Sequence, residues 1–464
     1  MDRISDSGSE DSSSNLLEGT MIMKNKTLKY ILFYLLIGLV IFPLIQQLYP
    51  FLRVEKLYGE FKEEVKPAFS FNHWFSADFQ NHYEKNINDE IGFKPFFVRT
   101  YNQLSYSIFS LSSAKDFVLG KQGYLYGINY IDSYQGKDYL GDEILDISFE
   151  RLAKLNDTLL SLNKKLILIL APSKARVLSQ YLPNRYSTKQ DIKTNYDEIA
   201  NRLSKTNVSY LDFNKYFQVN NESSKYPLMN KSGVHWSKYG VIISMDSIVK
   251  YVSLIAKVNL PKIKYDTLVL TNIPQHSDGD IIKVMNLFYE NRDQRLAYPQ
   301  LHIETSKADK KRPRLLVVGD SFYWGMYYNG LQDKIFDRGE FWYYFKTIYP
   351  EDYIEGKAVN REVGQMDIKK EIEKFDIIIS MQTEVNLPSF GIGFINKLYS
   401  IYFPDDKSDR YINLKLEFYK KMIRENKTLM KLIHIKSKEQ NISIEQAIFN
   451  DAIYFQKLER GESN

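Results

Sequence analysis

The chain has 464 residues, of which 44% are hydrophobic and 26% charged, and its formal net charge is +5. This composition is that of a globular protein with one large domain and appendages, and neither the small net charge nor any motif supports a nucleic-acid partner. The chain has no cysteine, which excludes disulfides, thiolate metal sites and a cysteine nucleophile.

The first long apolar run predicts a transmembrane anchor at residues 30–52, where no charged residue occurs. About 20 such residues cross a bilayer as a helix. Lys24, Lys26 and Lys29 precede the run. By the positive-inside tendency they stay in the cytoplasm, so everything after Arg53 is expected across the membrane. The expected location is the inner (cytoplasmic) membrane, with the main domain periplasmic or otherwise extracytoplasmic. The run ends without the small residues of a cleavage site, which favours an uncleaved anchor over a removed signal peptide.

The segments on either side of the anchor have different characters. Residues 1–29 are expected to be a cytoplasmic tail that is acidic and serine-rich at first, which indicates disorder, and basic near the anchor. Residues 53–115 show helical periodicity with many aromatic positions. We interpret this segment as a helical lead-in that lifts the main domain off the membrane.

The main domain is expected at residues 116–404. It contains short, largely apolar runs without clean alternation, at 166–170, 208–211, 315–318, 341–345 and 377–379. Such runs are typical of strands that are covered on both faces of a parallel sheet. Helix-length segments lie between them, for example at 147–162 and 191–203. The pattern predicts an α/β doubly wound domain, in which ligands bind beyond the carboxyl ends of the strands.

Residues 405–464 predict a C-terminal extension of two amphipathic helices. One is strongly basic and spans 414–435, and the other starts at Ser443, which forms a capping box with Gln446. We expect a packed helix pair. The alternative is a docking surface for a membrane partner.

A candidate nucleophile follows the strand at 315–318. Gly319 permits a sharp turn, and Ser321 then lies where a helix begins, so that nearby N–H groups can stabilise an oxyanion. The alternative is an ordinary helix N-cap at Asp320 or Ser321. Tyr327, shortly after the serine, is expected to face either the core or a sugar.

A serine nucleophile requires a base, and the chain has six histidines. His235 is the best candidate, because it lies with Trp236 in a loop-like stretch before an apolar helical pattern. After the strand at 377–379, polar residues including Thr383 and Asn386 fall at another carboxyl end. They are expected either to line the pocket or to form an exposed loop.

Five short segments occur in an order that is similar to one known family. They are Gly120–Tyr126, Pro172–Lys174, His235–Ser237, Asp278–Ile281 and Gly319–Phe322. They resemble the "GkdGwLf", "P-x-K", "HW(S/T)", "GDL" and "GDSF" blocks of the alginate O-acetyltransferase accessory proteins of the AlgJ and AlgX type, an SGNH-hydrolase-like family also called DHHW. The resemblance is spread over most of residues 85–390.

This resemblance implies an SGNH-hydrolase-like fold in permuted order, with Ser321 as acyl nucleophile, His235 as general base and the N–H of Ser321 at the oxyanion site. The family commonly carries Asp two residues before the histidine, where this chain has Gly233. Asp280 or Glu384 is then expected to replace the missing carboxylate in space, unless a Ser–His dyad suffices or activity is reduced or lost.

The resemblance also implies the reaction. An acetyl group passes to the serine and then to a sugar hydroxyl of an exported polysaccharide, and the donor side is a multi-spanning O-acyltransferase in the same membrane. Neither a metal nor another cofactor is expected. The alternatives are an O-acetyl esterase with the same residues, and a non-catalytic polysaccharide-binding or assembly component.

Overall fold

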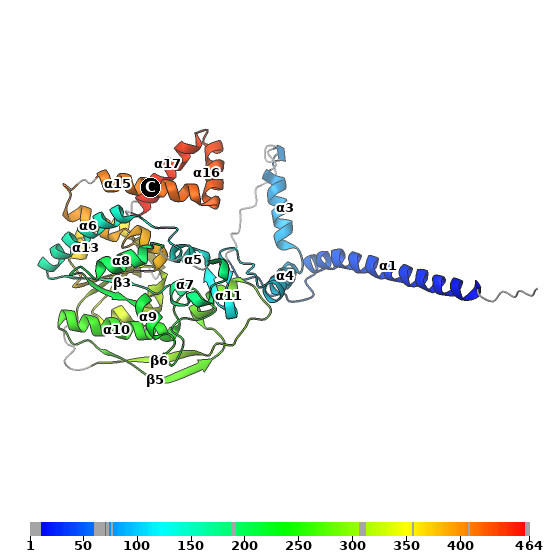
Figure 1. Ribbon diagram of the computed structural model, residues 1–464, viewed down its shortest axis with the longest axis horizontal. Helices are drawn as coiled ribbons and strands as arrows, with labels where there is room; N and C mark the ends of the chain where they lie inside the picture. Colours follow the sequence, from blue (N-terminus) through cyan, green and yellow to red (C-terminus); the bar gives the residue numbers. More distant parts are fainter. Residues whose placement is uncertain are drawn as a thin grey trace, which may run out of the picture. The chain divides into compact units, whose positions relative to one another are not determined.

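The computed structural model describes residues 11–59, 70, 74–75, 78–186, 192–305, 312–354, 357–406 and 409–459. The chain forms two compact units (Figure 1). The smaller unit comprises Met1–Ser110 together with Lys283–Tyr289, and the larger unit comprises Leu111–Ile282 and Glu290–Asn464.

A seven-stranded sheet of order β10-β9-β8-β7-β11-β3-β4 forms the centre of the larger unit. Its parallel strands are β3 (Lys165–Leu170), β4 (Ser209–Asp212), β7 (Leu315–Gly319), β8 (Glu340–Tyr343) and β11 (Ile377–Gln382). Two antiparallel strands, β9 (Thr347–Ile354) and β10 (Lys357–Glu362), extend one edge. The expected α/β, mostly parallel architecture is confirmed. Each run predicted as a strand overlaps a strand of this sheet, although Val208, Tyr344 and Phe345 lie outside the strands.

Helices cover both faces of the sheet, which explains why its central strands lack polar alternation. Along β3, Ile167 and Ile169 belong to one apolar cluster, while Leu166 and Leu168 belong to the other. The first cluster includes residues of α9 (Phe213–Asn220) and α10 (Lys238–Ala256). The second includes residues of α6 (Asp142–Ser161), α8 (Asn195–Leu203) and α14 (Phe394–Tyr402).

Several smaller elements of the larger unit were not predicted. Two antiparallel pairs lie outside the main sheet, β1 (Phe117–Leu119) with β2 (Leu125–Gly127), and β5 (Lys262–Thr271) with β6 (Leu296–Glu304). The side chains of β5 are mostly exposed, so this strand has no apolar run to mark it. The short helices are α5 (Ile128–Tyr134), α7 (Lys174–Val177), α11 (Asp280–Val284), α12 (Trp324–Tyr327) and α13 (Ile368–Ile372).

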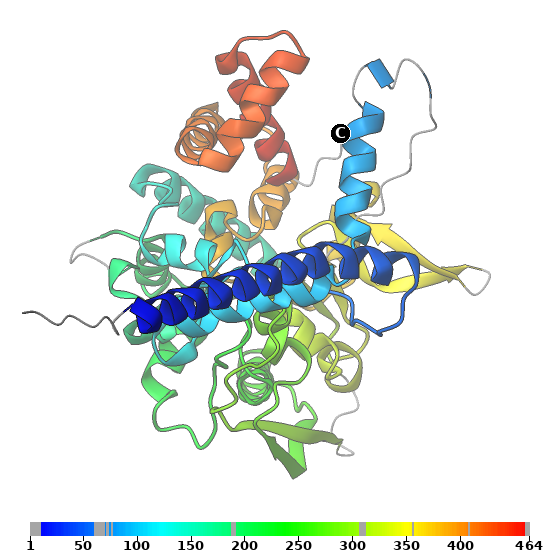
Figure 2. The same ribbon diagram turned by 90° about the vertical axis from the view of Figure 1, so that its right-hand side faces the viewer.

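The C-terminal extension has three helices rather than the expected two. They are α15 (Asp409–Glu425), α16 (Lys427–Glu439) and α17 (Ile444–Glu459), drawn in orange to red in Figure 2. The basic pattern at 414–435 is interrupted at Asn426, whose side chain accepts hydrogen bonds from Thr428 and Leu429 and so caps a new helix. Ser443 caps α17 by accepting the N–H of Gln446. The helices pack on one another around a small apolar cluster.

The smaller unit contains α1 (Asp11–Leu48), α3 (Asp78–Glu90) and α4 (Lys94–Phe109). Within α1, Lys26–Leu48 is long and apolar enough for a membrane span or a signal sequence. Helix α10 is also long and apolar enough to cross a membrane, but half of its most apolar 18-residue segment is buried in the core.

The expected C-terminal end of the anchor and the expected helical lead-in both require correction. The helix that contains the apolar run ends at Leu48 rather than Leu52. The side chain of Gln46 then donates to the carbonyl of Leu52 and accepts its N–H, which holds the non-helical residues after Leu48. The lead-in is not helical at 51–59, and its prediction for 60–69, 71–73 and 76–77 lies outside the described residues.

Candidate active site

Ser321 begins a tight 3-10 turn directly beyond the carboxyl end of β7. The N-cap of this turn is Asp320, which is buried and accepts the N–H of Phe322 at 3.1 Å. The second carboxylate oxygen of Asp320 accepts hydrogen bonds from Thr383 N, Thr383 Oγ1 and Asn386 Nδ2 at 2.7, 2.8 and 2.8 Å. Because Asp320 performs the capping, the half-buried hydroxyl of Ser321 is left for another partner.

That partner is His235, which lies 86 positions earlier in the chain. Its Nε2 is 3.0 Å from Oγ of Ser321. The neighbouring Trp236 is fully buried and donates its indole N–H to the carbonyl of Phe322 at 3.2 Å. This bond fixes the histidine segment directly onto the serine turn, and α10 starts immediately afterwards at its N-cap, Ser237.

Asp280, at the start of α11, completes the arrangement. Its Oδ2 lies 2.7 Å from Nδ1 of His235, and its Oδ1 accepts the N–H of Val234 at 2.8 Å. A carboxylate beside Nδ1 favours the tautomer that carries its proton there, so Nε2 is left as the acceptor for the serine hydroxyl proton. Three separate segments of the chain therefore form a continuous Ser–His–Asp hydrogen-bonded chain.

The position two residues before the histidine has no room for a side chain. A Cβ on Gly233 would fall well inside contact distance of the carbonyl oxygen of Ser277, 2.9 Å from Oδ1 of Asp280 and 3.0 Å from Oδ1 of Asn230. The carboxylate of Asp280 and the backbone beside it occupy the space that an aspartate at 233 would require. The departure from the family pattern is thus matched by a carboxylate from another segment.

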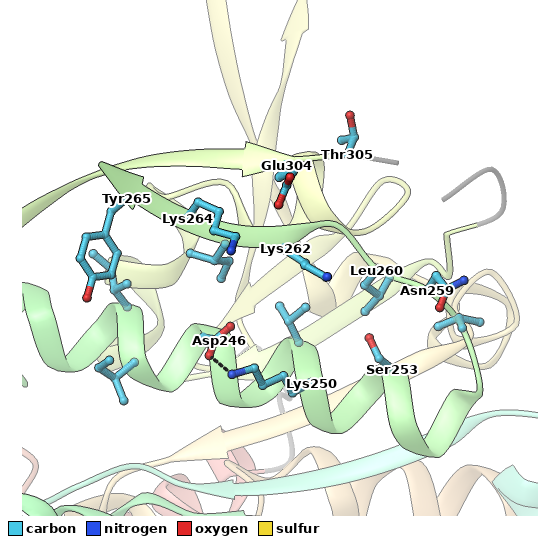
Figure 3. Close-up of a pocket in the computed structure, with 15 residues that line it drawn as sticks. Asp246, Lys250, Ser253, Asn259, Leu260, Lys262, Lys264, Tyr265, Glu304 and Thr305 are labelled. Atoms are coloured by element: carbon cyan, nitrogen blue, oxygen red, sulfur yellow. Dashed lines mark ion pairs between the residues drawn. The ribbon is translucent and has the colours of Figure 1, made fainter. Parts of the chain in front are cut away.

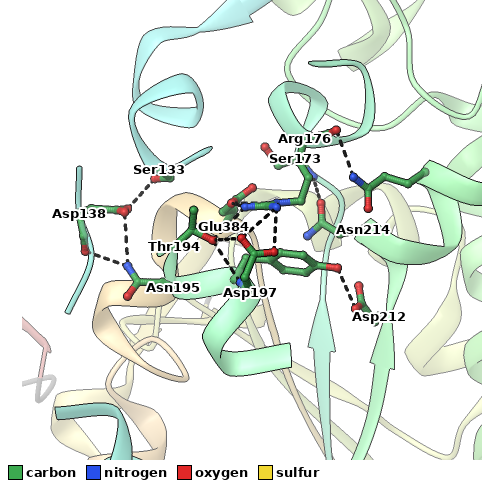
Figure 4. Close-up of polar contacts among 12 residues, drawn as sticks. Ser133, Asp138, Ser173, Arg176, Thr194, Asn195, Asp197, Asp212, Asn214 and Glu384 are labelled. Atoms are coloured by element: carbon green, nitrogen blue, oxygen red, sulfur yellow. Dashed lines mark hydrogen bonds and ion pairs between the residues drawn. The ribbon is translucent and has the colours of Figure 1, made fainter. Parts of the chain in front are cut away.

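Glu384, the other carboxylate considered for this role, is directed elsewhere. It forms a buried ion pair with Arg176, whose Nε lies 3.0 Å from Oε1 (Figure 4). Arg176 also bonds Asp197 and packs over the ring of Tyr196. Burial raises the pKa of Glu384, and the guanidinium counteracts this rise. The prediction that Glu384 could orient His235 is therefore wrong, because its carboxylate faces Arg176.

The other predicted pocket residues divide into two groups. Thr383 and Asn386 lie just after β11 and donate hydrogen bonds to the carboxylate of Asp320, so they hold the turn that contains Ser321. A cavity of about 360 Å³ adjoins Ser321, and Trp324 and Tyr328 are among its lining residues. Tyr327 is not among them and packs instead against Phe341. Trp324 and Tyr328 share a helix face and stack with ring centroids 5.3 Å apart.

Two residues at the site were not assigned a role from the sequence. Tyr344 follows β8, and its hydroxyl interacts with the side chains of Ser321 and Asn386. Burial and the nearby Asp320 raise the pKa of Tyr344 to about 12, so the phenol stays protonated at neutral pH. The sequence feature that could have indicated a role for Tyr344 is its position just after β8, the strand that pairs with β7.

Lys174 follows β3 and is the second such residue. Its buried Nζ donates to the carbonyls of Leu125, Lys231 and Gly233. It thereby ties the segment before His235 to the carboxyl end of β3. Burial lowers the pKa of Lys174 to about 7, and the negative charge of Asp280 counteracts part of this decrease.

A larger cavity of about 790 Å³ lies between α10 and β5 (Figure 3). Its lining includes the ion pair of Asp246 with Lys250, 2.6 Å apart, and Lys262 and Lys264 of β5. None of the Ser–His–Asp residues lines it. Among the described residues, no group of three or more histidine and acidic side chains is placed to hold a metal ion.

Residues 118–332 match the family described as "SGNH hydrolase-like domain, acetyltransferase AlgX". The match spans just under half of the chain and shows that this segment is similar to SGNH hydrolase-like domains of the AlgX type. The resemblance inferred from the five short segments is thereby confirmed. No curated protein sequence matches the chain significantly.

Solved structures with similarity to the chain include the O-acetyltransferase domain of Pseudomonas putida AlgJ, at 16% identity over 61% of this chain and 99% of that one, with a TM-score of 0.40. Pseudomonas aeruginosa AlgX matches at 12% identity over 60% of this chain and 67% of that one, with a TM-score of 0.39. Bacillus cereus PatB1 matches at 14% identity over 59% of this chain and 97% of that one, with a TM-score of 0.35.

Proposed function

We propose that the AlgX-type domain is an O-acetyltransferase in which Ser321 is the acyl nucleophile, His235 the general base and Asp280 the group that orients the base. The observation that carries this proposal is the hydrogen-bonded chain at the edge of the sheet, with distances of 3.0 Å from Ser321 to His235 and 2.7 Å from His235 to Asp280. Such a chain activates a hydroxyl that is otherwise a weak nucleophile.

The reaction proceeds in two steps. In the first, Oγ of Ser321 attacks the acetyl carbonyl carbon of the donor while Nε2 of His235 takes the hydroxyl proton. The tetrahedral intermediate then expels the donor's leaving group, which receives the proton from Nε2, and an acetyl-serine ester remains. In the second step a sugar hydroxyl attacks this ester, its proton passes to Nε2 and then to Oγ, and the acetylated sugar leaves.

Two donors are available for the oxyanion of the tetrahedral intermediate. The N–H of Phe322 is already accepted by Asp320, whereas no acceptor takes the N–H of Ser321 among the described residues. We assign the protonated hydroxyl of Tyr344, which lies near the side chain of Ser321, as the second donor. Donors held in place before the reaction stabilise the developing charge without reorganisation.

The acceptor sugar is assigned to the cavity of about 360 Å³ beside Ser321. The ring of Tyr328 is 76% exposed and rests on Trp324, which gives a flat apolar surface for a pyranose ring. The acceptor is then an exported polysaccharide, as for the family, and the acetyl donor is supplied through a multi-spanning O-acyltransferase. We place Lys26–Leu48 across the inner membrane, with the N-terminus in the cytoplasm and the larger unit in the periplasm.

An O-acetyl esterase is the second candidate. The side chains of His235 and Asp280 are 21% and 31% exposed, so water reaches the triad and can replace the sugar hydroxyl. The two functions differ only in the acceptor of the second step.

The test uses the full chain in detergent with a chromogenic acetyl ester. Ser321→Ala and His235→Ala are expected to lose at least about a thousand-fold in turnover. Ser161→Ala, an exposed serine at the end of α6, is the matched control and should retain full activity. Adding a polysaccharide fragment and detecting its acetylated product by mass spectrometry separates the transferase from the esterase. Equal turnover by the parent chain and Ser321→Ala would refute the proposal.

A further inference from the structure

We propose that α4 of the smaller unit lies in the lipid head-group region on the exported side of the membrane, with one apolar stripe in contact with lipid. This inference rests on the membrane anchoring that is part of the proposed function. It goes beyond that function, because it assigns a second membrane-binding element that follows the span.

The stripe consists of Phe97, Tyr101, Leu104 and Ile108. These positions are separated by four, three and four residues, so the side chains lie on one face of α4. They are 42%, 69%, 50% and 64% exposed. Four consecutive large apolar or aromatic side chains on one helix face, all exposed to this extent, are not expected on a surface that meets only water.

The other side of α4 makes the polar contacts of the smaller unit. Arg99 donates to the carbonyls of Glu55 and Lys56, each at 2.8 Å. The buried Asn102 donates to the carbonyl of Met285 at 2.7 Å. Gln103 accepts the N–H groups of two residues in the segment at 283–289. Amphipathic helices of water-soluble domains have the opposite arrangement, with the apolar face inward and the polar face outward.

The start of α4 lies at the end of the proposed membrane span (Figure 1). Gly92 lies so close to α1 that a Cβ there would overlap the carbonyl oxygen of Pro43 and come within 2.8 Å of Gln46 Cβ. The rings of Phe51 and Phe93 also meet, with centroids 5.9 Å apart. The beginning of α4 is therefore held at the level where the span leaves the bilayer.

Lipid is the occupant that these observations favour. A span that crosses the bilayer is surrounded by lipid at its end, and α4 is fixed to that end, so its stripe is presented to head groups without any further partner. The stripe contains no charged residue and includes phenylalanine and tyrosine, and aromatic side chains are enriched at this depth of the membrane. A partner protein on the stripe is the competing outcome of the test.

The absence of cysteine allows a direct test with single-cysteine variants of the full chain in phospholipid nanodiscs. Leu104→Cys and Ile108→Cys report on the stripe, Leu36→Cys is the reference within the span, and Ser161→Cys is the aqueous reference on the larger unit. Each carries an environment-sensitive fluorophore. The fluorophore is challenged with a nitroxide near the head of the lipid chain, a nitroxide near its tail, and a water-soluble quencher.

We expect labels at 104 and 108 to be quenched by the shallow nitroxide at least about twice as strongly as by the deep one, and to be shielded from the aqueous quencher. The label at 36 should respond to lipid nitroxides, and the label at 161 only to the aqueous quencher. Unchanged circular dichroism and melting temperature show that each variant is folded.

Three results would overturn the inference. Aqueous quenching at 104 and 108 shows a stripe in water, and shielding from every quencher shows a stripe covered by protein. In both cases a lipid-quenched label at 36 leaves the anchoring intact, and turnover of the acetyl ester remains a separate measurement. An aqueous response at 36 removes the anchoring and the inference together, but not the proposed chemistry of Ser321.

Discussion

Oδ1 of Asp280 lies 2.9 Å from the point where a Cβ would stand on Gly233, so a side chain at 233 would force the Asp280 carboxylate to move. The carboxylate beside His235 comes from the start of α11 instead of from the histidine segment. Its loss should therefore affect the base and leave the serine turn unchanged.

Asp280→Asn is expected to lower kcat/KM for an acetyl ester by about a hundred- to ten thousand-fold at neutral pH, because an amide no longer holds His235 in the tautomer that accepts the serine proton. The measurement is steady-state kinetics, with folding checked by thermal melting. Asp266→Asn is the control, since Asp266 is 84% exposed on the β5–β6 pair. Wild-type kinetics for Asp280→Asn would show that a dyad suffices.

Gly233→Ala should damage the site although it adds only one carbon. The methyl group would meet the carbonyl oxygen of Ser277 and the Asp280 carboxylate, and relief of such overlap typically costs about 1–3 kcal/mol of unfolding free energy. We expect a lower melting temperature and a lower turnover. Gly38→Ala is the control, because its Cβ would make an ordinary contact at 3.6 Å with Phe42. Equal melting temperatures for both variants would contradict the packing argument.

Tyr328→Ala separates acceptor binding from chemistry. Removal of the exposed ring should raise KM for the sugar acceptor by roughly ten-fold, since an aromatic contact of this kind is worth about 1 kcal/mol or more. Hydrolysis of a small acetyl ester should change little, because Ser321 and His235 are untouched. Tyr353→Ala, at an equally exposed position on β9, serves as the control. Parallel losses in both reactions would place Tyr328 in the acyl step.

Replacing Arg176 should be more harmful than replacing Glu384. Arg176→Met leaves the fully buried Glu384 carboxylate without its guanidinium, which typically costs about 3–5 kcal/mol of stability, whereas Glu384→Gln leaves no buried anion. Chemical denaturation measures the difference. The pH dependence of turnover by folded Glu384→Gln should equal that of the parent chain, because Glu384 does not contact His235. A shifted profile would show that Glu384 acts on the base after all.

The stability of the protein should vary with pH through Asp278, which is 2% exposed beside the histidine segment. Burial raises the pKa of Asp278 from 3.8 to about 6, and hydrogen bonds from Tyr298 and its neighbours only partly counteract this. Between pH 3.8 and about 6, Asp278 is protonated in the folded state and ionised in the unfolded state. The stability that Asp278 contributes is therefore fully present at low pH and is lost as the pH rises toward 6.

Asp278→Asn removes this dependence. The unfolding free energy of the variant relative to the parent chain should therefore increase by about 2 kcal/mol as the pH rises from 4 to 7. Urea denaturation at several pH values measures it. A difference that stays constant over this range would contradict the raised pKa.

The sequence predicted those parts of the fold where burial on two faces leaves a continuous apolar run, such as β3 and β11. It did not predict β5, whose side chains are mostly exposed, or the break at Asn426, where one capping side chain outweighs a continuous amphipathic pattern. These features depend on local hydrogen bonds and exposure that hydrophobic periodicity does not report.

At the site, strand-end position and motif order were enough to select Ser321 and His235 as candidates. They did not separate Asp280 from Glu384. One carboxylate follows a turn and the other a strand end, and only the course of the chain places Asp280 beside Nδ1 and Glu384 against Arg176. Tyr344 was missed for a similar reason. A tyrosine after a strand is common, and its relation to Ser321 depends on the neighbouring order of β7 and β8.

The division of the chain has a practical consequence for the preparation of the larger unit without residues 1–110. The smaller unit contains residues 283–289 as well as the N-terminal part, so three junctions join it to the larger unit. Truncation before Leu111 would remove the partners of residues 283–289. These residues would lose the hydrogen bonds that join Asn102 to Met285 and Tyr58 to Asn286. Residues 283–289 begin three residues after Asp280, so a version of the chain without residues 1–110 requires redesign at 283–289 as well as at its new N-terminus.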